Sequence, residues 1–349
     1  MKPSPDVFDT ASEEARHKAS AEGEGGAAGY RPDQTTIILV ITAIIAMVLS
    51  VALKGFFSLG NFFALLRGVS VLGVFGLGMA VVVVGKGIDL SQIAIGAVCA
   101  ALSIVMIGAG FPVLVSLGAC LAVAGCLGVF NGFLISVVEI PALFATLASG
   151  LLFLGIARST YVKHYVVYLS AGHQGLLSLG GNIAGVVPVP VIIFIGCALV
   201  THLFLSRTVL GHFIYGHGDN ADAARLAGIA VRPLTMLEYA VSAMIGYVGA
   251  VMMVSASGMM HLQIAEGTFI YDVILVVVLG GVSLLGGRGN VMSVIAGALL
   301  IGVMKDAMTI ANVVSQTQQI IMGAVLLLAL VLDSYIHPRD EETAKQGEF

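Results

Sequence analysis

The chain consists mostly of apolar segments long enough to cross a membrane, and no other feature constrains its fold as strongly. A spanning helix needs about 20 predominantly apolar residues, because each residue rises 1.5 Å and the hydrocarbon layer is roughly 30 Å thick. Ten segments meet or approach this length: 36–53, 62–84, 90–108, 111–136, 142–160, 188–205, 235–257, 270–285, 290–311 and 317–335. We therefore predict an all-α polytopic membrane protein with about ten transmembrane helices.

The distribution of charge agrees with a location in lipid. Only 10% of the 349 residues are charged, whereas a soluble domain carries roughly 25%. Seventeen of the 36 charged residues lie in residues 1–33 and 337–349, so nineteen remain for the long apolar region between them. These are too few to cover a water-exposed surface. The net charge of −4 gives no reason to propose a nucleic acid as a partner.

The two ends of the chain are polar. Residues 1–35 are rich in Glu, Ala, Gly and Ser, which predicts a disordered tail, and residues 336–349 form a second tail after the transmembrane domain of residues 36–335. An even number of spans places both tails on one side, and the bias of Lys and Arg favours the cytoplasm. The loops on that side contain Lys86, Arg207, Arg225, Arg232 and Arg288, against Lys54 and Lys163 on the other. We expect a multi-pass protein of the cell inner membrane.

Glycine is unusually frequent and follows a helical pattern in one segment. Gly118, Gly125, Gly128 and Gly132 recur on one helix face, and the last two form a GxxxG pair. Small residues allow close contact between helices in lipid, so these glycines predict helix packing. In addition, residues 81–91 resemble residues 276–286. Such similarity suggests the duplicated halves that are typical of transporters, with the pathway at their interface.

Several polar residues interrupt the apolar region. Asp89 follows a long apolar run and is flanked by Gly87 and Ser91. The chain there either breaks within the membrane at a pathway or gate, or forms an ordinary solvated turn. The candidates for lining a pathway or gate are Asp89, Ser91, Asn131, Thr146 and Asp272. Lys305 and Asp306 are expected to form a local pair near a helix end, or to face the pathway.

Motifs of catalysis and metal binding are absent from the sequence. There is no HExxH, no GxSxG and no GxxxxGK[ST] phosphate loop. The eight His lack the spacing of metal ligands, and the four Cys lie inside apolar runs, where buried structural thiols are expected. We therefore expect no catalytic residue, no metal site and no cofactor bound by this chain. An intramembrane enzyme is disfavoured for the same reason.

The polar stretch "NADAARLAGI" at residues 220–229 lies between two membrane-length runs and predicts a short helix. Asn220 is a suitable N-cap, and Gly228 is a suitable terminating residue. Leu226 and Ile229 would form an apolar pair at its tip. A short exposed helix of this kind is typical of a docking element that a partner's groove receives. The alternative is a surface helix that rests on the membrane.

This stretch also carries a resemblance to a known family. Residues 211–231, "GHFIYGHGDNADAARLAGIAV", resemble the cytoplasmic loop of ribose-type ABC importer permeases, within the branched-chain amino acid/sugar permease superfamily. "GIDLS" (87–91), residues 131–149 and residues 272–290 are similar to three further family stretches in the same order. Lys86 and the Lys305–Asp306 pair depart from the family pattern, which leaves the sugar open.

The resemblance implies a type II-like permease bundle that works with other chains. Two permease subunits, identical or different, would form the pore, and separate ABC ATPase subunits would use ATP-Mg to drive it. A substrate-binding protein would deliver a monosaccharide, such as a ribose-like pentose, a hexose or a related polyol. Residues 219–230 would form the coupling helix. The residues implied in ATPase coupling are Gly218, Asn220, Ala223, Ala224, Arg225, Leu226, Gly228 and Ile229.

One alternative class of transporter stays open at this stage. An ion- or proton-coupled secondary transporter of a small polar solute would require paired carboxylates within the membrane. Asp89 and Asp272 are the candidates for such a pair. A contact between them would favour this reading over an ATP-driven importer.

Overall fold

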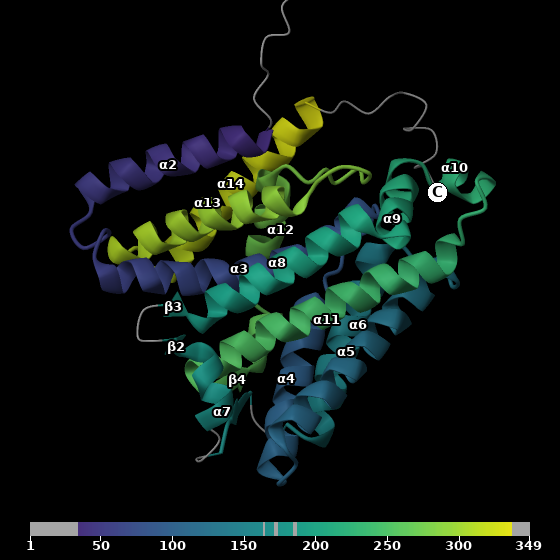
Figure 1. The fold of residues 1–349 in the computed structure, drawn as a ribbon, viewed down its shortest axis with the longest axis horizontal. Helices are drawn as coiled ribbons and strands as arrows, with labels where there is room; N and C mark the ends of the chain where they lie inside the picture. Colours follow the sequence, from purple (N-terminus) through teal and green to yellow (C-terminus); the bar gives the residue numbers. More distant parts are fainter. Residues whose placement is uncertain (1–33, 163–164, 171–173, 184–186, 337–349) are drawn as a thin grey trace, which may run out of the picture. The chain divides into compact units, whose positions relative to one another are not determined.

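The computed structural model describes residues 34–162, 165–170, 174–183 and 187–336 (Figure 1). The predicted tails, residues 1–35 and 336–349, lie almost entirely outside these described residues, so their disorder stays a prediction. These described residues form one unit.

Helices account for nearly all of the described chain, and each of the ten predicted apolar segments contains one. Their bounds are α2 (Gln34–Ala52), α3 (Leu59–Val84), α4 (Gln92–Gly108), α5 (Val113–Ser136), α6 (Ala142–Thr160), α8 (Val189–Arg207), α11 (Val231–Ser257), α12 (Phe269–Gly280), α13 (Val291–Ile310) and α14 (Ser315–Ile336). Two further helices, α9 (Val209–Asp219) and α10 (Ala221–Leu226), form the polar connection between α8 and α11.

Short elements close the connections at the other end of α11. Strand β1 (Val166–Tyr168) pairs antiparallel with β4 (Met259–His261), and β2 (Asn182–Ile183) pairs antiparallel with β3 (Val187–Pro188). Short helical turns α7 (Gln174–Leu177), η2 (Ser178–Gly180) and η3 (Leu262–Ala265) lie beside these strands in the sequence.

Seven of the helices in the described part of the chain are long and apolar enough to cross a membrane: α2, α3, α5, α6, α8, α11 and α13. The all-α membrane fold is thereby confirmed, whereas the count of about ten spans is not. The segment predicted at 270–285 is shorter than expected, because Gly281 adopts a φ of 97° and ends α12 at Gly280. Such left-handed geometry stops a helix and suits glycine.

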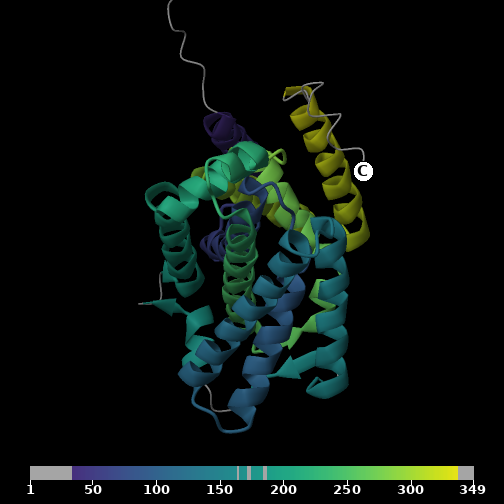
Figure 2. The ribbon, with the colours of Figure 1, turned by 90° about the vertical axis from the view of Figure 1, so that its right-hand side faces the viewer.

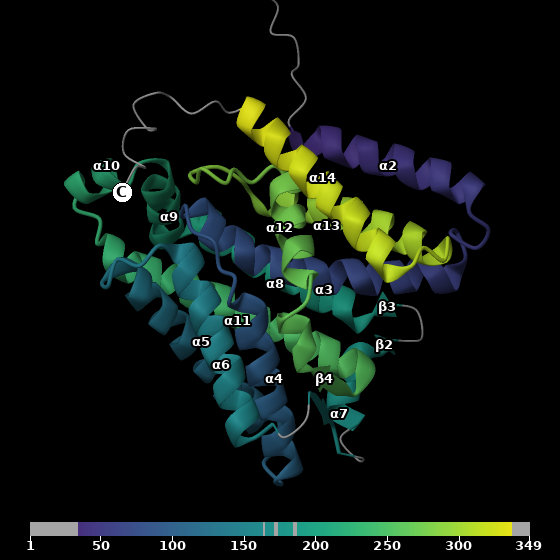
Figure 3. The same ribbon diagram turned by 180° about the vertical axis from the view of Figure 1, so that it is seen from behind.

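The core of the bundle is built around α3 and α11. Residues 72–84 of α3 and its C-cap Gly85 are all buried, as expected for a helix that is apolar on every side. Helix α11 packs against α3, α4 and α5, and α3 also contacts α8, α12 and α13. Viewed from behind, α4, α5 and α6 lie next to one another (Figure 3). Helix α14 lies at the edge of the bundle, against α12 (Figure 2).

Glycines allow α5 to approach α11 closely. A Cβ added at Gly128 would lie 2.7 Å from the Cα of Ala240, and one added at Gly132 would lie 3.0 Å from the backbone nitrogen of Met236. A Cβ at Gly125 would lie 3.3 Å from a side chain of α11, whereas one at Gly118 would meet no atom within 4 Å. The contact thus involves Gly125, Gly128 and Gly132, and Gly118 is not part of it.

Candidate functional site

Three connections singled out in the sequence meet at one end of the bundle, which we call the α10 end. It consists of the α3–α4 turn (85–91), the polar connection with α9 and α10 (208–230) and the α12–α13 turn (281–290), and Figure 1 shows α9 and α10 there. The backbone N–H of Gly287 donates to the carbonyl of Val84 at 2.8 Å. The hydroxyl of Tyr215 donates to the carbonyl of Gly289 at 2.6 Å.

Helix α10 forms because both of its ends are capped by suitable residues. The Asn220 side-chain oxygen accepts from the backbone N–H groups of Asp222 at 3.1 Å and Ala223 at 2.9 Å, as an N-cap does. Gly228 follows the helix with a φ of 81°, and the N–H of Ile229 donates to the carbonyl of Ala224 at 3.0 Å. The predicted caps are therefore present. The helix itself spans only Ala221–Leu226, shorter than the expected 219–230.

The tip of α10 is fully open to its surroundings. Leu226 is 91% exposed, and Arg225 forms an exposed ion pair with Asp222 at 3.3 Å. Ala224 is buried on the opposite side, and Ile229 packs against the core. Leu226 and Ile229 therefore do not form the expected joint apolar tip, because the chain turns at Gly228 between them. Leu226, Arg225 and Asp222 remain for contact with a partner.

Three glycines connect α9 to the two turns, and we call them the glycine joint: Gly218, Gly286 and Gly287. A Cβ at Gly218 would overlap the Val84 carbonyl oxygen and lie 2.6 Å from the Gly287 nitrogen. One at Gly286 would lie 2.7 Å from the Gly218 carbonyl oxygen, and one at Gly287 would lie 2.8 Å from the Cα of Asp219. The two resembling segments, 81–91 and 276–286, thus meet at the end of α9.

Four of the five candidate pathway residues come together beneath this joint. Asp89, Ser91, Asn131 and Thr146 are fully buried. The Ser91 hydroxyl donates to the Asp89 carboxylate and accepts from the Asn131 side-chain amide at 2.6 Å. The backbone N–H of Leu90 donates to the Thr146 hydroxyl at 3.2 Å. The α3–α4 turn is therefore bonded to both α5 and α6.

Two further members of this cluster were missed by the sequence analysis. The Ser242 hydroxyl of α11 donates to the second carboxylate oxygen of Asp89 at 2.9 Å. The Gln92 side-chain amide donates to the carbonyls of Phe75 at 3.1 Å and Ser242 at 3.3 Å. Both residues are fully buried. A single Ser or Gln in an apolar run carries no periodic signal that could have identified it.

This cluster holds a non-helical turn inside the bundle. Irregular backbone at membrane depth is tolerated where protein surrounds it and its polar groups find partners. The Asp89 carboxylate accepts hydrogen bonds from both Ser91 and Ser242. The side-chain oxygens of Asn131 and Gln92, by contrast, are buried without a hydrogen-bond partner among the described residues. Buried polar networks fix one arrangement of the chain when they are satisfied. Any role of these residues in a pathway stays a prediction.

Asp272 lies apart from this cluster. It forms an ion pair with Lys305 of α13, while Asp306 accepts a hydrogen bond from the Asn61 side chain at 2.7 Å. Lys305 and Asp306 thus face different partners and do not form the expected local pair. Since Asp89 is bonded to Ser91 and Ser242, the two carboxylates that a secondary transporter would need do not meet.

A pocket of about 880 Å³ opens between α10 and the ends of α5 and α11. Its charged lining comprises Lys86, Glu139, His217, Arg225, Arg232 and Glu238. Glu139 and Arg232 form an exposed ion pair at 3.6 Å. Burial lowers the pKa of His217, and the positive charges of Arg225 and Lys86 lower it further. The neutral form of this histidine is therefore favoured at the α10 end.

Nothing in the described part of the chain resembles a metal site, since no group of three or more His, Cys, Asp or Glu converges there. Cys99 and Cys120 are buried, Cys197 is half-buried and Cys126 is exposed. The expectation of four buried thiols is thus wrong for Cys126. This residue lies on the outer face of α5, where a small apolar side chain is also suited to lipid.

Comparison with known proteins gives a consistent result. A family described as "Branched-chain amino acid transport system / permease component" matches residues 61–330. The chain is 30% identical to the ribose import permease protein RbsC of Escherichia coli K12, over 85% of this chain and 92% of that protein. It is 28% identical to the fructose import permease protein FrcC of Rhizobium meliloti, over 87% of this chain and 86% of that protein.

A third relative is the L-arabinose transport system permease protein AraH of Escherichia coli K12, with 28% identity over 85% of this chain and 90% of that protein. No solved structure matches significantly.

Proposed function

We propose that this chain, which belongs to the family of branched-chain amino acid transport system permease components, is the membrane-spanning subunit of an ATP-binding cassette importer for a monosaccharide. The observation that carries the proposal is the exposed α10, which follows directly on α9, whose end contacts two turns of the bundle through backbone atoms. Such an element can receive motion from another protein and pass it to the helices.

The relatives support a sugar as the cargo. Their names give ribose, fructose and L-arabinose as the imported solutes. The similarity extends over most of each chain, so the transmembrane domain as a whole is comparable. We infer that this permease carries a pentose, a hexose or a related polyol across the inner membrane.

The energy would come from a separate ATPase subunit that uses ATP-Mg. The sequence contains no phosphate-binding loop. Leu226, Arg225 and Asp222 would contact a groove of the ATPase, because an exposed apolar residue beside charged ones suits helix-in-groove recognition. Movement of the ATPase would tilt α9. Since α9 contacts Val84 and Gly287 directly, both the α3–α4 turn and the α12–α13 turn would shift with it.

The cluster around Asp89 is our candidate for the element that this motion alters. It ties the α3–α4 turn to α5, α6 and α11 through side-chain hydrogen bonds. Displacing the turn would exchange these bonds for others and change the relative positions of three helices. We infer that Asp89, Ser91, Asn131 and Thr146 act as a gate.

The proposed orientation places the α10 end and both termini in the cytoplasm. The basic residues of that end, Lys86, Arg207, Arg225, Arg232 and Arg288, agree with the bias of Lys and Arg toward cytoplasmic loops. A second permease subunit, identical or different, would complete the pore. A substrate-binding protein would dock at the opposite end, where β1 and β4 pair.

The test is a double substitution on α10, Arg225→Glu with Leu226→Glu. The variant should fold, because both side chains are exposed, but lose uptake of labelled ribose, fructose or L-arabinose in vesicles and lose co-purification with the ATPase subunit. Arg225→Lys with Leu226→Met keeps charge and apolar size, and should retain both activities. Undiminished uptake and ATPase association in the double Glu variant would refute the docking role.

A further inference from the structure

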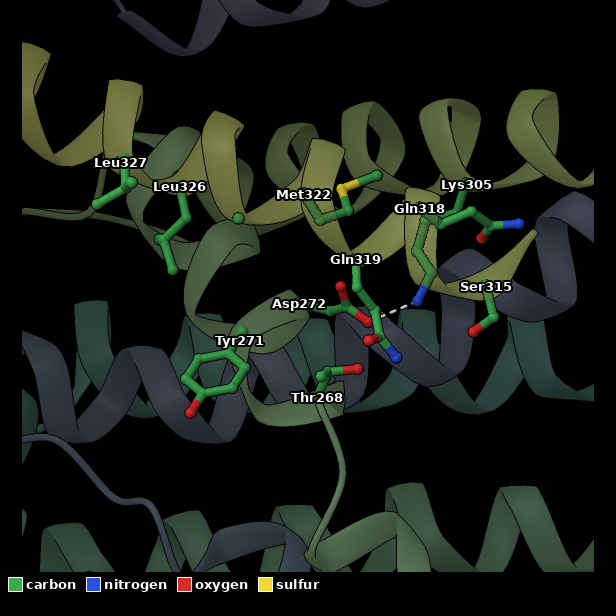
Figure 4. Close-up of a pocket in the computed structure, with 11 residues that line it drawn as sticks. Thr268, Tyr271, Asp272, Lys305, Ser315, Gln318, Gln319, Met322, Leu326 and Leu327 are labelled. Atoms are coloured by element: carbon green, nitrogen blue, oxygen red, sulfur yellow. Dashed lines mark hydrogen bonds and ion pairs between the residues drawn. The ribbon is translucent and has the colours of Figure 1, made fainter. Parts of the chain in front are cut away.

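A second pocket, of about 440 Å³, lies between α12, α13 and α14, around the Asp272–Lys305 ion pair and apart from the Asp89 cluster and the α10 end (Figure 4). Its volume is within the range of small-ligand sites, roughly 300–1,000 Å³. It is lined by the first turn of α12, the last third of α13 and one face of α14. Asp272 lies near the start of α12 and Lys305 near the end of α13, so most of each helix separates them from the α12–α13 turn at the α10 end.

The lining divides into a polar part and an apolar part. Thr268, Asp272, Lys305, Ser315 and Gln319 lie together, where α13 nears its end and α12 and α14 begin. Met322, Leu326 and Leu327 continue the pocket along α14, and Figure 4 shows Leu326 and Leu327 on the side away from Ser315. The pocket therefore suits a molecule with one polar and one apolar end.

The length of the pocket matches one leaflet of a bilayer. Ser315 and Leu326 are eleven residues apart on α14, which corresponds to about 16 Å along a helix. Half of a hydrocarbon layer of roughly 30 Å is about 15 Å. Leu327 is 67% exposed and Tyr271 is 53% exposed. The pocket is thus open along an apolar surface, from which lipid can enter sideways.

The polar part contains two opposite charges, Lys305 and Asp272, which use only part of their hydrogen-bonding capacity on each other. Lys305 donates to one carboxylate oxygen of Asp272, and an ammonium group has three donors. Within the described residues, the other Asp272 oxygen and the side chains of Thr268, Ser315 and Gln319 have no hydrogen-bond partner. Charges at membrane depth are costly and usually face a functional partner. A ligand with a phosphate and an ammonium could bind on both sides of this pair.

We propose that this pocket binds one phospholipid whose headgroup carries both a phosphate and a primary amine, as in phosphatidylethanolamine. The amine donates to the free oxygen of Asp272, and the phosphate accepts from Lys305 and the neighbouring Gln319 and Ser315. The Lys305–Asp272 pair stays intact between them, so positive and negative charges alternate. One acyl chain lies along Met322 and Leu326. The proposal rests on the membrane setting and does not depend on the transported solute.

The test measures lipid retained by the full-length protein in native mass spectrometry, after exchange into vesicles of phosphatidylethanolamine, phosphatidylglycerol or phosphatidylcholine. Wild type should retain phosphatidylethanolamine in preference to the other two, since phosphatidylglycerol has no amine and phosphatidylcholine has no N–H donor. Asp272→Asn should reduce this retention about tenfold, as expected for one charge-assisted hydrogen bond. Lys305→Gln should weaken phosphatidylethanolamine and phosphatidylglycerol alike.

The neighbouring Asp306→Asn is the matched control, because Asp306 faces Asn61 and not the pocket. It should retain lipid as wild type does. A further variant, Gln319→Ala, covers the case in which a charge variant fails to fold, because Gln319 is exposed and its removal leaves no charge unpaired. It should lower the retention of phosphatidylethanolamine severalfold. Equal retention of the three lipids by wild type would overturn the proposal. So would pocket variants that keep the lipid but change the half-saturation of sugar uptake, since the pocket would then be a solute site.

Discussion

Replacing Gly218 by alanine should uncouple transport, because this glycine is where α9 meets both turns. The added methyl would overlap the Val84 carbonyl oxygen and lie 2.6 Å from the Gly287 nitrogen and 3.0 Å from the Val84 carbonyl carbon. Ordinary contacts between such atoms are about 3.5 Å or longer. The Val84 carbonyl and the end of α9 must therefore separate by roughly 1.5–2 Å to reach an ordinary contact, and the hydrogen bond from Gly287 to Val84 lies in the same place.

The free-energy change can be worked from these contacts. Overpacking a well-filled site costs about 1–3 kcal/mol, and a lost backbone hydrogen bond costs about 1 kcal/mol more. The higher helix propensity of alanine stabilises the folded protein by up to about 1 kcal/mol relative to glycine. The net destabilisation should be about 1–3 kcal/mol. It is confined to the glycine joint, so α10 itself keeps its caps and its exposed tip.

The assay compares Gly218→Ala with Gly216→Ala in the same helix. Gly216 is exposed, and a Cβ there meets no atom within 4 Å, so this control should match or slightly exceed wild type in Tm and should transport normally. Gly218→Ala should still bind the ATPase subunit while uptake and the coupling of ATP hydrolysis to it fall at least tenfold. If Gly218→Ala transports sugar at the wild-type rate with an unchanged Tm, the glycine joint does not transmit motion.

Three further outcomes follow from the site. Asn131→Leu should lower the Tm and abolish uptake, because it removes the donor to Ser91 within a buried network; unaltered uptake would exclude a gating role. Gly132→Ala should cost about 1–3 kcal/mol of stability, measured by thermal unfolding, whereas Gly118→Ala, which has open space, should not. The pKa of His217 is lowered in the folded protein from 6.5, so its stabilising contribution is complete above about pH 6.5 and is lost as the pH falls below that value. His217→Gln should flatten the decline of the Tm in acid, and an equally steep decline would show that another group titrates.

Local features of the sequence predicted local features of the structure well. Asn220 and Gly228 correctly indicated both ends of α10, because capping depends on side-chain chemistry within a few residues. The apolar lengths likewise located the helices. The extent of α10 was overestimated, since Ile229 packs against the core after the turn. The choice between an exposed tip and a core contact for an apolar residue is made by tertiary structure.

The composition of the polar cluster could be predicted only in part. Asp89 and Ser91 are neighbours in the sequence, but their contacts with Asn131 and Ser242 depend on how α5 and α11 pack. Asp272 was placed among the same candidates because a carboxylate in an apolar run is conspicuous wherever it lies. Its actual partner, Lys305, is 33 residues away on another helix. Sequence identifies which polar residues need partners, and packing determines which partners they obtain.

Contact through bare backbone has a mechanical consequence for the glycine joint. A side chain between two elements can change rotamer and absorb a small displacement, but Gly218, Gly286 and Gly287 offer no such freedom. A tilt of α9 must therefore appear at Val84 and at the α12–α13 turn with little loss of amplitude. The residues that line a solute's route could vary between relatives with different cargoes while this stiff linkage stays the same.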